Sequence, residues 1–522
     1  MARDFWEDYC SEHPSLMPFF ADSPRNIGDK VKSAPSWNPD LLQAVMQYQT
    51  RLGVQRVCDE NTAVIITGQQ PGLLAGPMFT IYKALTAVLL ADKLAQETKR
   101  QCTPVFWVAA DDHDFAEVRS VHLLGRRHER VTLRYDPDET AMVDAMPMHR
   151  LPLSQSLHEI IDEAARVTPG SECRVEVAGF LHESLDASAS MADWFAAIMA
   201  RLFRDTPLIF FTPALPEARA ACLSILEKEI TEPLDTTRLL RATGDRLRAL
   251  DYTVQLIKSP KQCAFFLEMG GRRRRVFFEN DRFVIPDEAI SCAPDEMRAI
   301  LHAAPERFSP NAALRCVVQQ ALFPVAACVV GPGELAYWAQ LKPVFERHAL
   351  PMPILYPRMR GAVVGAKTAK LMRKFGFTVS DATLPEETLL TRALRAEYSS
   401  DALAALERRK LEMDAALQGL ARDLEGIGAA KGAVAPLIDG VSDRVREGLE
   451  KIEQALLHLD AAKKEAILKQ VRRVQEELAP DQKPQERIYS PFSFLFEQGW
   501  DFVPRLLHAM DVNRFDLQEV AL

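Results

Sequence analysis

The sequence predicts an α/β fold in which helices cover a parallel sheet, followed by a helical coiled coil in the C-terminal third. Two observations lead to this prediction. Apolar segments at residues 63–110 follow the order strand, helix, strand of a βαβ unit. After residue 400 the pattern changes, and apolar residues recur every three or four positions over long stretches, which is typical of a coiled coil.

The βαβ unit begins with residues 63–66, which are apolar, partly β-branched and therefore predict a buried strand. Residues 78–94 carry apolar side chains at helical spacing, and residues 103–110 predict a second buried strand. Further buried strands are predicted within 205–214 and 322–348, and the latter runs into a Gly-Pro-Gly turn and a helix. This order predicts parallel strands joined by right-handed crossovers.

Residues 251–285 alternate between apolar and polar side chains and are interrupted by the pairs SP, GG and ND. This pattern predicts β-hairpins inserted into the core. Four consecutive arginines, Arg272–Arg275, adjoin the Gly270-Gly271 turn. They fit either a solvated hairpin end or a contact with an anionic ligand, and the sequence leaves both interpretations open.

Two long helices are predicted in the C-terminal third. Lys410 takes one position of the first helix's seam, whose apolar members are Leu403, Leu406, Met413, Leu417, Leu420, Leu424 and Ile427. The second helix runs from Val441 to Leu478, and an extra step of four between Leu459 and Ile467 resembles a stutter that unwinds a supercoil. Joined by a loop, the two helices would form an antiparallel hairpin that either dimerises or packs against the protein's own body.

The overall composition is that of an ordinary globular protein. The chain has 522 residues, with 63 Lys and Arg against 72 Asp and Glu, so its net charge of -9 does not call for nucleic acid or an anionic membrane as partner. No apolar stretch approaches the roughly 20 residues that cross a bilayer, and the N-terminus lacks a signal-peptide pattern. We therefore expect a cytoplasmic protein. Its nine cysteines include no CxxC pair and are expected to be reduced, buried thiols.

The first candidate site is the turn TGQQPG after the first strand. Gly68 and Gly72 would let backbone amides approach a ligand, and the following helix would present its positive end, which suits an anionic group. The turn fits neither the dinucleotide-binding nor the P-loop fingerprint, and a simple connecting turn is the alternative. The expected binding residues are Thr67, Gly68, Gln69, Gln70, Thr80 and Lys83.

The second candidate site is the sequence DDHD at the carboxyl end of the next strand, where open α/β sheets place ligands. A substrate ammonium, a Mg2+ ion or a nearby Lys or Arg would offset the carboxylate charge, unless an aspartate only caps the next helix. One histidine among carboxylates is a poor zinc set, and no resident metal is predicted. The residues concerned are Trp107, Asp111, Asp112, His113, Asp114 and Glu117.

The third candidate site is the sequence GPGELAYW at residues 331–338. Gly331 and Gly333 open a helix after an apolar strand, and Glu334 enters its first turn. Tyr337 and Trp338 either wall a pocket or belong to the core. Two upstream residues, Arg315 and Gln319, complete the expected binding set.

Long motifs in this order resemble one family. The segments TGQQPGLLAGPMFTIYKA, PVFWVAADDHDFAEV, MADWF, FSPNAALRCVVQQALFPVAACVVGPGELAYWAQLKPVFE and PQERIYS resemble the cysteine-adding ligases of bacillithiol biosynthesis, the BshC family. The resemblance covers essentially the whole chain. It implies a Rossmann-like core related to class I aminoacyl-tRNA synthetases and nucleotidyltransferases, with connecting-peptide insertions and a coiled coil used for homodimerisation.

The resemblance also implies a division of the chain. The core would occupy residues 1–385, with insertions at about 130–200 and 230–310. An antiparallel coiled coil would follow at 386–480, and a helical segment at 481–522 would pack back on the core.

The implied reaction is the last step of bacillithiol synthesis, in which a ligase joins the carboxyl group of L-cysteine to the free amine of glucosaminyl malate. The carboxylates of residues 111–114 would hold substrate ammonium groups, while malate carboxylates or phosphate would lie on the amides of a glycine turn. Asp112, His113 and Asp114 are the expected catalytic residues, one of which would take a proton from the attacking amine.

Activation of the cysteine carboxyl group would call for ATP with Mg2+. Class I synthetases use a histidine-bearing HxGH turn, whereas this sequence has Gln69 and Gln70 there and no KMSKS-like loop, so the use of ATP stays open. Two other functions remain as alternatives. One is a nucleotide-dependent ligase or transferase acting on another amine and amino acid, and the other is a non-enzymatic ligand sensor whose coiled coil recruits a partner.

Overall fold

A computed structural model describes residues 3–137, 143–397, 401–426, 434–457 and 461–521. The chain forms two compact units, which are Met1–Gly361 with Glu486–Val520, and Ala362–Gln485 with Ala521–Leu522. The predicted core boundary at residue 385 therefore lies inside the second unit. The chain returns to the first unit at Glu486, near the predicted start of the last segment at 481.

The first unit is built on a five-stranded parallel sheet with the order β12-β11-β1-β2-β5. Its strands are Ile354–Pro357 (β12), Val325–Val330 (β11), Ala63–Gln69 (β1), Cys102–Val108 (β2) and Ile209–Phe211 (β5). Helix α4, Phe79–Thr98, connects β1 to β2 and confirms the predicted βαβ unit. Strands β5 and β11 also lie within the segments predicted for them.

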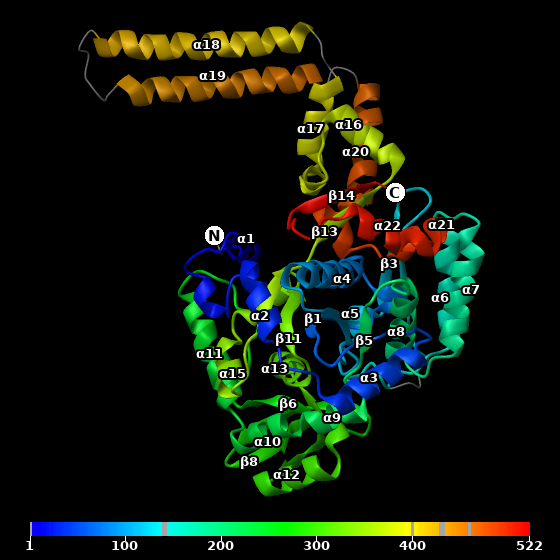
Figure 1. Cartoon of the computed structure of the whole chain (residues 1–522). Helices are drawn as coiled ribbons and strands as arrows, with labels where there is room; N and C mark the ends of the chain where they lie inside the picture. Colours follow the sequence, from blue (N-terminus) through cyan, green and yellow to red (C-terminus); the bar gives the residue numbers. More distant parts are fainter. Residues whose placement is uncertain (1–2, 138–142, 398–400, 427–433, 458–460, 522) are drawn as a thin grey trace. The chain divides into compact units, whose positions relative to one another are not determined.

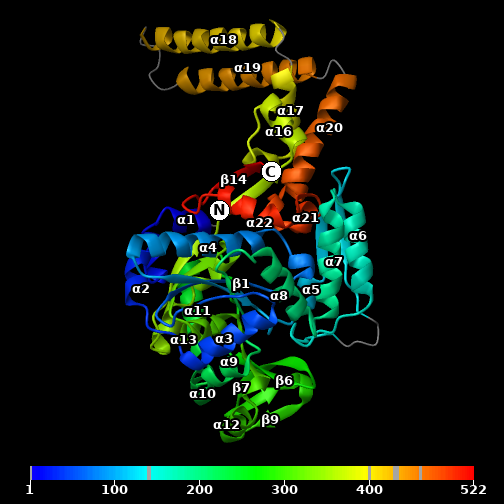
Figure 2. The ribbon, with the colours of Figure 1, turned by 45° about the vertical axis from the view of Figure 1, so that its right-hand side comes forward.

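Helices cover both faces of this Rossmann-like sheet. In both views of the ribbon, α4 lies on one side of β1, and α3 (Pro39–Arg51) and α13 (Ala312–Leu322) lie on the other (Figures 1 and 2). A strand covered on both faces has no solvent side and reads as a continuous apolar run. Accordingly Val64, Ile65 and Ile66 are completely buried, and burial of each side chain contributes about 1.5–3 kcal/mol.

The insertion predicted from alternating residues is a second, antiparallel sheet with the order β10-β6-β7-β8-β9. Gly270 and Gly271 join β6 to β7 with φ of 56° and 75°, a left-handed conformation that glycine adopts without strain. Asn280 and Asp281 make the next turn, also with positive φ. The strands are Gln262–Met269 (β6), Arg272–Glu279 (β7), Arg282–Ile285 (β8), Ile290–Cys292 (β9) and Phe308–Pro310 (β10).

The remaining elements of the first unit surround the sheet. Between β2 and β5 lie Ser120–Leu124 (β3), Arg130–Arg134 (β4), Ser156–Val167 (α6), Cys173–Asp186 (α7) and Met191–Leu202 (α8). Near the C-terminus, α21 (Phe492–Gln498) packs against α7 and β3, and α22 (Phe502–Ala509) packs against α4. Among the described helices of both units, none is long and apolar enough to span a membrane.

The second unit contains α18 (Asp401–Gly426) and α19 (Val434–Leu457), which lie side by side (Figure 1). The predicted single helix from Val441 to Leu478 is instead two helices, because α19 ends at Leu457 and α20 begins at Ala461. The reason is their surroundings: α20 packs against α16 (Ala366–Phe375) and α17 (Glu386–Glu397) rather than continuing the pair. Of the predicted seam positions, Ile427 and Leu459 lie outside the described residues.

The polar seam position of α18 is neutralised within this unit. Lys410 Nζ lies 2.6 Å from a carboxylate oxygen of Glu453 on α19, which is 3% exposed. Arg395 of α17 bonds the other oxygen of the same carboxylate at 2.5 Å. Lys410 therefore occupies the interface between the two helices as half of a salt bridge.

Candidate active site

A cavity of about 710 Å³ lies at the carboxyl ends of β1, β2 and β11, all within the first unit. Parallel α/β sheets commonly bind ligands at this edge. The cavity brings together residues from all three predicted sites, which lie far apart in the sequence. Those that line it are Gly68, Gln69, Gln70, Lys83, Trp107, Asp111, Asp112, His113, Asp114, Glu117, Arg315, Gly331, Gly333, Glu334 and Tyr337.

Four residues expected to bind substrate lie outside this lining. The Thr67 hydroxyl donates to the Val329 carbonyl at 3.1 Å and so bonds the neighbouring strand. Thr80, Gln319 and Trp338 are also buried in the packed interior of the unit. Burial makes all four side chains part of the core, and their contact with substrate stays a prediction.

The glycine turn after β1 is shaped by packing. A Cβ atom on Gly68 would lie 2.6 Å from the Trp107 carbonyl oxygen of β2, and one on Gly72 would lie 2.9 Å from the Gly76 Cα. Helix α4 begins only at Phe79, so its positive end does not directly follow the glycines. Close packing therefore explains why both positions are glycine, and the predicted contact of this turn with an anionic group stays a prediction.

Lys83 of α4 contacts the same turn. Its Nζ donates to the Gly68 carbonyl at 2.7 Å and to Gln69 Oε1 at 3.0 Å, and lies 2.6 Å from Glu334 Oε2. Glu334 also accepts from the Gly331 N–H at 2.9 Å, at the start of α14 (Pro332–Trp338). Burial lowers the pKa of Lys83, and the charge of Glu334 opposes that shift. Lys83 therefore ties the turn after β1 to the turn after β11.

Asp111 is neutralised by a buried arginine. Both terminal nitrogens of Arg219, on α9 (Pro216–Ala221), bond its carboxylate, one of them at 3.0 Å. Burial would raise the pKa of Asp111, but the Arg219 guanidinium outweighs it and holds that pKa below its usual value. The nearby arginine that the sequence analysis considered as an offset is therefore present, and it pairs with Asp111 specifically.

Asp112 faces neutral partners instead. Its carboxylate accepts from the Asp114 N–H at 3.0 Å and from Gln70 Nε2 at 3.0 Å, and the same amide nitrogen donates to Glu117 at 3.1 Å. Burial would raise the pKa of Asp112, but these hydrogen bonds hold it below its usual value. Among the described residues, no Lys or Arg forms an ion pair with Asp112, Asp114 or Glu117. These three carboxylates, called the acidic face below, therefore have no direct ion-pair partner among the described residues, and the charge of Arg273 acts on Asp112 without a contact.

His113 has a defined hydrogen-bonding state. Arg273 of β7 lies with Nη1 3.2 Å from His113 Nδ1, and an arginine can only donate. Nδ1 therefore accepts, and the neutral ring carries its proton on Nε2. Burial and the Arg273 charge lower the pKa of His113, which keeps the ring neutral near pH 7. Within the described chain nothing bonds Nε2, so His113 offers one N–H to the cavity.

The cavity also contains cationic residues that were not expected to bind ligand. Arg273 and Arg275 alternate along β7 and therefore share a face, which lines the cavity, while Arg274 on the opposite face pairs with Glu288 at 2.6 Å. A contact of the arginine run with an anionic ligand was one of the two interpretations left open by the sequence, but nothing in the sequence linked the run to the DDHD motif. Other lining residues that sequence reasoning missed include Lys258, Phe266, Asn311 and Arg487.

A Rossmann-like sheet with a charged cavity at its carboxyl edge defines a ligand-binding α/β protein. Residues 2–359 match the family profile "Bacillithiol biosynthesis BshC, N-terminal Rossmann-like domain", and residues 362–520 match "Bacillithiol biosynthesis BshC, C-terminal coiled-coil domain". The chain therefore belongs to the BshC family of bacillithiol biosynthesis.

Curated relatives agree with this assignment. A protein of Salinibacter ruber named "Putative cysteine ligase BshC" is 27% identical over 97% of this chain and 94% of its own length. Proteins of the same name from Symbiobacterium thermophilum and Anoxybacillus flavithermus are 30% and 28% identical, over 90% and 97% of this chain and 86% and 95% of their own lengths.

Proposed function

We propose that this protein is a carbon-nitrogen ligase that joins the carboxyl group of L-cysteine to the glucosamine amine of glucosaminyl malate, which forms bacillithiol. Membership of the BshC family and the printed names of its relatives support the reaction class. The observation in the structure that carries the proposal is the acidic face, because carboxylates without an ion-pair partner suit a substrate that arrives as an ammonium ion.

The acidic face would hold and then deprotonate the amine. Asp112 and Glu117, both bonded by the Gln70 amide, would accept N–H bonds from the glucosamine ammonium. Asp114 lines the same cavity and would take the proton that the amine must lose before it attacks. Asp111 would not take part directly, since its carboxylate is committed to Arg219.

His113 would act as a hydrogen-bond donor rather than as the base. Its Nε2–H would bond the cysteine carbonyl oxygen as negative charge develops there during attack. The nitrogen-carbon bond forms, the bond from carbon to the activated leaving oxygen breaks, and the amine proton passes to a carboxylate. The Arg273 contact at Nδ1 fixes the tautomer that this role needs.

Formation of an amide from a free carboxylate requires activation, and we propose ATP with Mg2+ as its source. The cavity fits the phosphates of such a group, because cationic side chains line it, and Mg2+ would enter bound to those phosphates, since the carboxylates of the acidic face are assigned to the amine. ATP would supply the leaving group on the cysteine carboxyl carbon.

We further propose that the protein works as a cytoplasmic homodimer joined through α18 and α19. Large apolar side chains lie exposed on these helices, including Leu411 at 71% and Leu437 at 70% exposure. A second copy would cover them. Light scattering on the purified protein should give twice the monomer mass, and Leu411→Glu with Leu437→Glu should give the monomer.

The test of the reaction is mass spectrometry of the purified protein with L-cysteine and glucosaminyl malate, with and without Mg-ATP. We expect bacillithiol in the tube with Mg-ATP, and loss of cellular bacillithiol in a strain that lacks the gene. A normal thiol pool in that strain would contradict the proposal. Product from another amine and amino acid would favour a different ligase, and ligand binding without any product would favour a sensor.

A further inference from the structure

The arginine run of the inserted sheet and a lysine from a neighbouring loop meet at one side of the cavity. Lys258 precedes β6, and Arg275 lies on β7, so both come from the insertion rather than from the parallel sheet. Both line the cavity that contains the acidic face. The cavity therefore contains charges of both signs. Carboxylates come from the segment after β2, and the insertion adds cations to those from other elements.

The two cations lie close enough to affect each other. Burial lowers the pKa of Lys258, and the charges of Arg275 and Arg273 lower it further. Like charges brought together in a partly buried site cost free energy unless an anion joins them. Arg273 adds to this positive potential, since its hydrogen bonds go to neutral acceptors, among them Ser309 Oγ at 2.8 Å.

Other cations of the same insertion have carboxylate partners. Lys261, three residues after Lys258, lies 3.2 Å from Glu279, and Arg274, adjacent to Arg275, lies 2.6 Å from Glu288. Lys258 and Arg275 form no such ion pair with any described residue. The contrast indicates that the two residues facing the cavity are held unpaired while their neighbours facing outward are paired.

The loop that carries Lys258 is anchored to the body of the unit. Arg241 of α11 (Asp235–Arg248) donates from Nη1 to the Lys258 carbonyl at 2.8 Å. Arg275 is fixed by the β6–β7 ladder, in which it pairs with Phe266. Both cations therefore project from anchored backbone, as a preformed binding site requires.

We propose that Lys258 and Arg275 form an oxyanion subsite that binds a carboxylate or phosphate group of a substrate. Charge-assisted hydrogen bonds from an ammonium and a guanidinium suit both groups. The subsite deepens the proposed function and rests on it for the choice of ligand. The group is either the malate carboxylates of the acceptor or a phosphate of the nucleotide, and it takes the role that the sequence had given to the glycine turn.

The test is isothermal titration calorimetry on the full chain, with glucosaminyl malate and with Mg-ATP as separate probes. Lys258→Met with Arg275→Met should raise the dissociation constant of one probe about ten- to a hundredfold, since the charge-assisted hydrogen bonds of both side chains are lost. The conservative pair Lys258→Arg with Arg275→Lys should retain most of the affinity. Weaker binding of glucosaminyl malate identifies carboxylate as the bound group, and weaker binding of Mg-ATP identifies phosphate.

The matched control removes the same charge from the same insertion outside the cavity. Lys261→Met with Arg282→Met should leave both dissociation constants within about twofold of the wild type, because both side chains are exposed and paired away from the site. Unchanged binding of both probes by the Lys258 and Arg275 variant, or no binding of either probe by the wild type, would overturn the subsite. The assay needs no turnover, so a protein that binds through this pair without forming product would contradict the ligase alone.

Discussion

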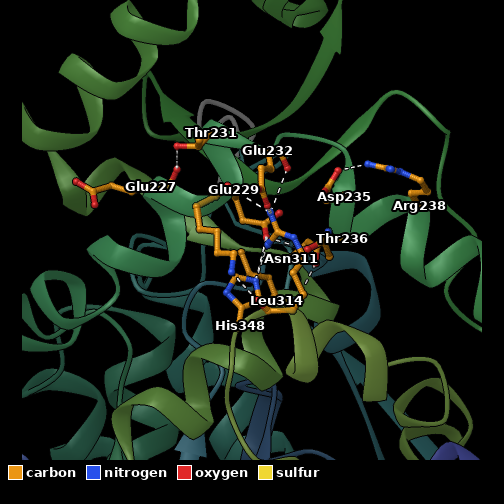
Figure 3. Close-up of polar contacts among 12 residues, drawn as sticks. Glu227, Glu229, Thr231, Glu232, Asp235, Thr236, Arg238, Asn311, Leu314 and His348 are labelled. Atoms are coloured by element: carbon orange, nitrogen blue, oxygen red, sulfur yellow. Dashed lines mark hydrogen bonds and ion pairs between the residues drawn. The ribbon is translucent and has the colours of Figure 1, made fainter.

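Two clusters of the first unit each combine carboxylate and histidine side chains, but one lines the cavity and the other is buried in the protein. One is the acidic face with His113, which lines the cavity. The other, shown in Figure 3, centres on Glu229 of α10 (Leu223–Thr231), which is completely buried. Its carboxylate oxygen accepts from Thr236 at 2.8 Å and from Arg347 at 2.5 Å, and His348 Nε2 lies 3.0 Å from the same oxygen.

The difference lies in where the charge is balanced. The Glu229 cluster joins α10 to α11 and α15 (Lys342–Arg347), and its charge is balanced by protein groups. The carboxylates of the acidic face form no ion pair with a described cation, although the charge of Arg273 acts on Asp112, and they line a cavity. A cluster of acids and histidine therefore indicates a ligand site only when its charge is left for the ligand to balance.

We call the Glu229 cluster the closed cluster, and the acidic face with His113 the open cluster. The largest effect on stability is expected from breaking the closed cluster. Glu229→Ala removes the buried carboxylate that Arg347 and His348 share and leaves Arg347 paired only with the half-exposed Glu232, which should lower the free energy of unfolding by about 3–5 kcal/mol in urea titrations. The exposed pair of Asp235 with Arg238, in the same view, supplies the control, and Asp235→Ala should cost under about 1 kcal/mol. Equal costs for the two variants would mean that the buried cluster is not what stabilises these helices.

Asp111 sharpens the comparison, since it lies at the cavity but is paired like the closed cluster. Asp111→Ala leaves Arg219 buried and unpaired, and should lower the free energy of unfolding by about 3 kcal/mol. Asp114→Ala, three residues along, removes an exposed and unpaired carboxylate and should change it by less than about 0.5 kcal/mol. Similar stability of the two variants in urea would contradict the division between structural and functional aspartates.

His113 tests the open cluster without altering its charge. His113→Ala should lower kcat about 100-fold, because a hydrogen-bond donor at the developing oxyanion is lost. His113→Gln keeps an N–H donor and should recover part of that loss, while the melting temperature of both variants stays near that of the wild type. A larger defect in the glutamine variant than in the alanine variant would argue against a donor role.

The smallest effect concerns a half-buried pair in the second unit. Arg392 bonds the Asp381 carboxylate and lowers the pKa of Asp381 to about 2. Because the folded-state pKa is depressed, the pair stabilises the fold above about pH 4 and loses this contribution as the pH falls toward 2. Solvent screening limits the contribution to about 1 kcal/mol. Urea titrations should separate Asp381→Asn from the wild type at pH 6 and bring them together near pH 2, whereas a constant gap would contradict the assignment.

The sequence predicts those elements that are encoded by neighbouring residues in the chain. The βαβ unit follows from apolar runs, and the hairpin turns follow from Gly270-Gly271 and Asn280-Asp281, because glycine and asparagine tolerate positive φ. The break between α19 and α20 was missed, since apolar spacing continues through it while the packing partners change.

The candidate site could be located from sequence but not assembled. The DDHD motif is contiguous and lies where ligands bind, so its position was predictable. Its partners were not, because Arg219 and Arg273 are 108 and 160 residues from the aspartate and histidine that they bond. The packing role of Gly68 was hidden for the same reason, since the atom that a side chain would strike belongs to another strand.

The central claim is that the open cluster is catalytic and not structural. Its most direct test is product formation by the variant Asp112→Asn with His113→Ala, measured by mass spectrometry beside its thermal melt. We predict that turnover falls by at least about 100-fold while the melting temperature stays near that of the wild type. A melting temperature that falls together with the activity would contradict the claim and place these residues with the closed cluster.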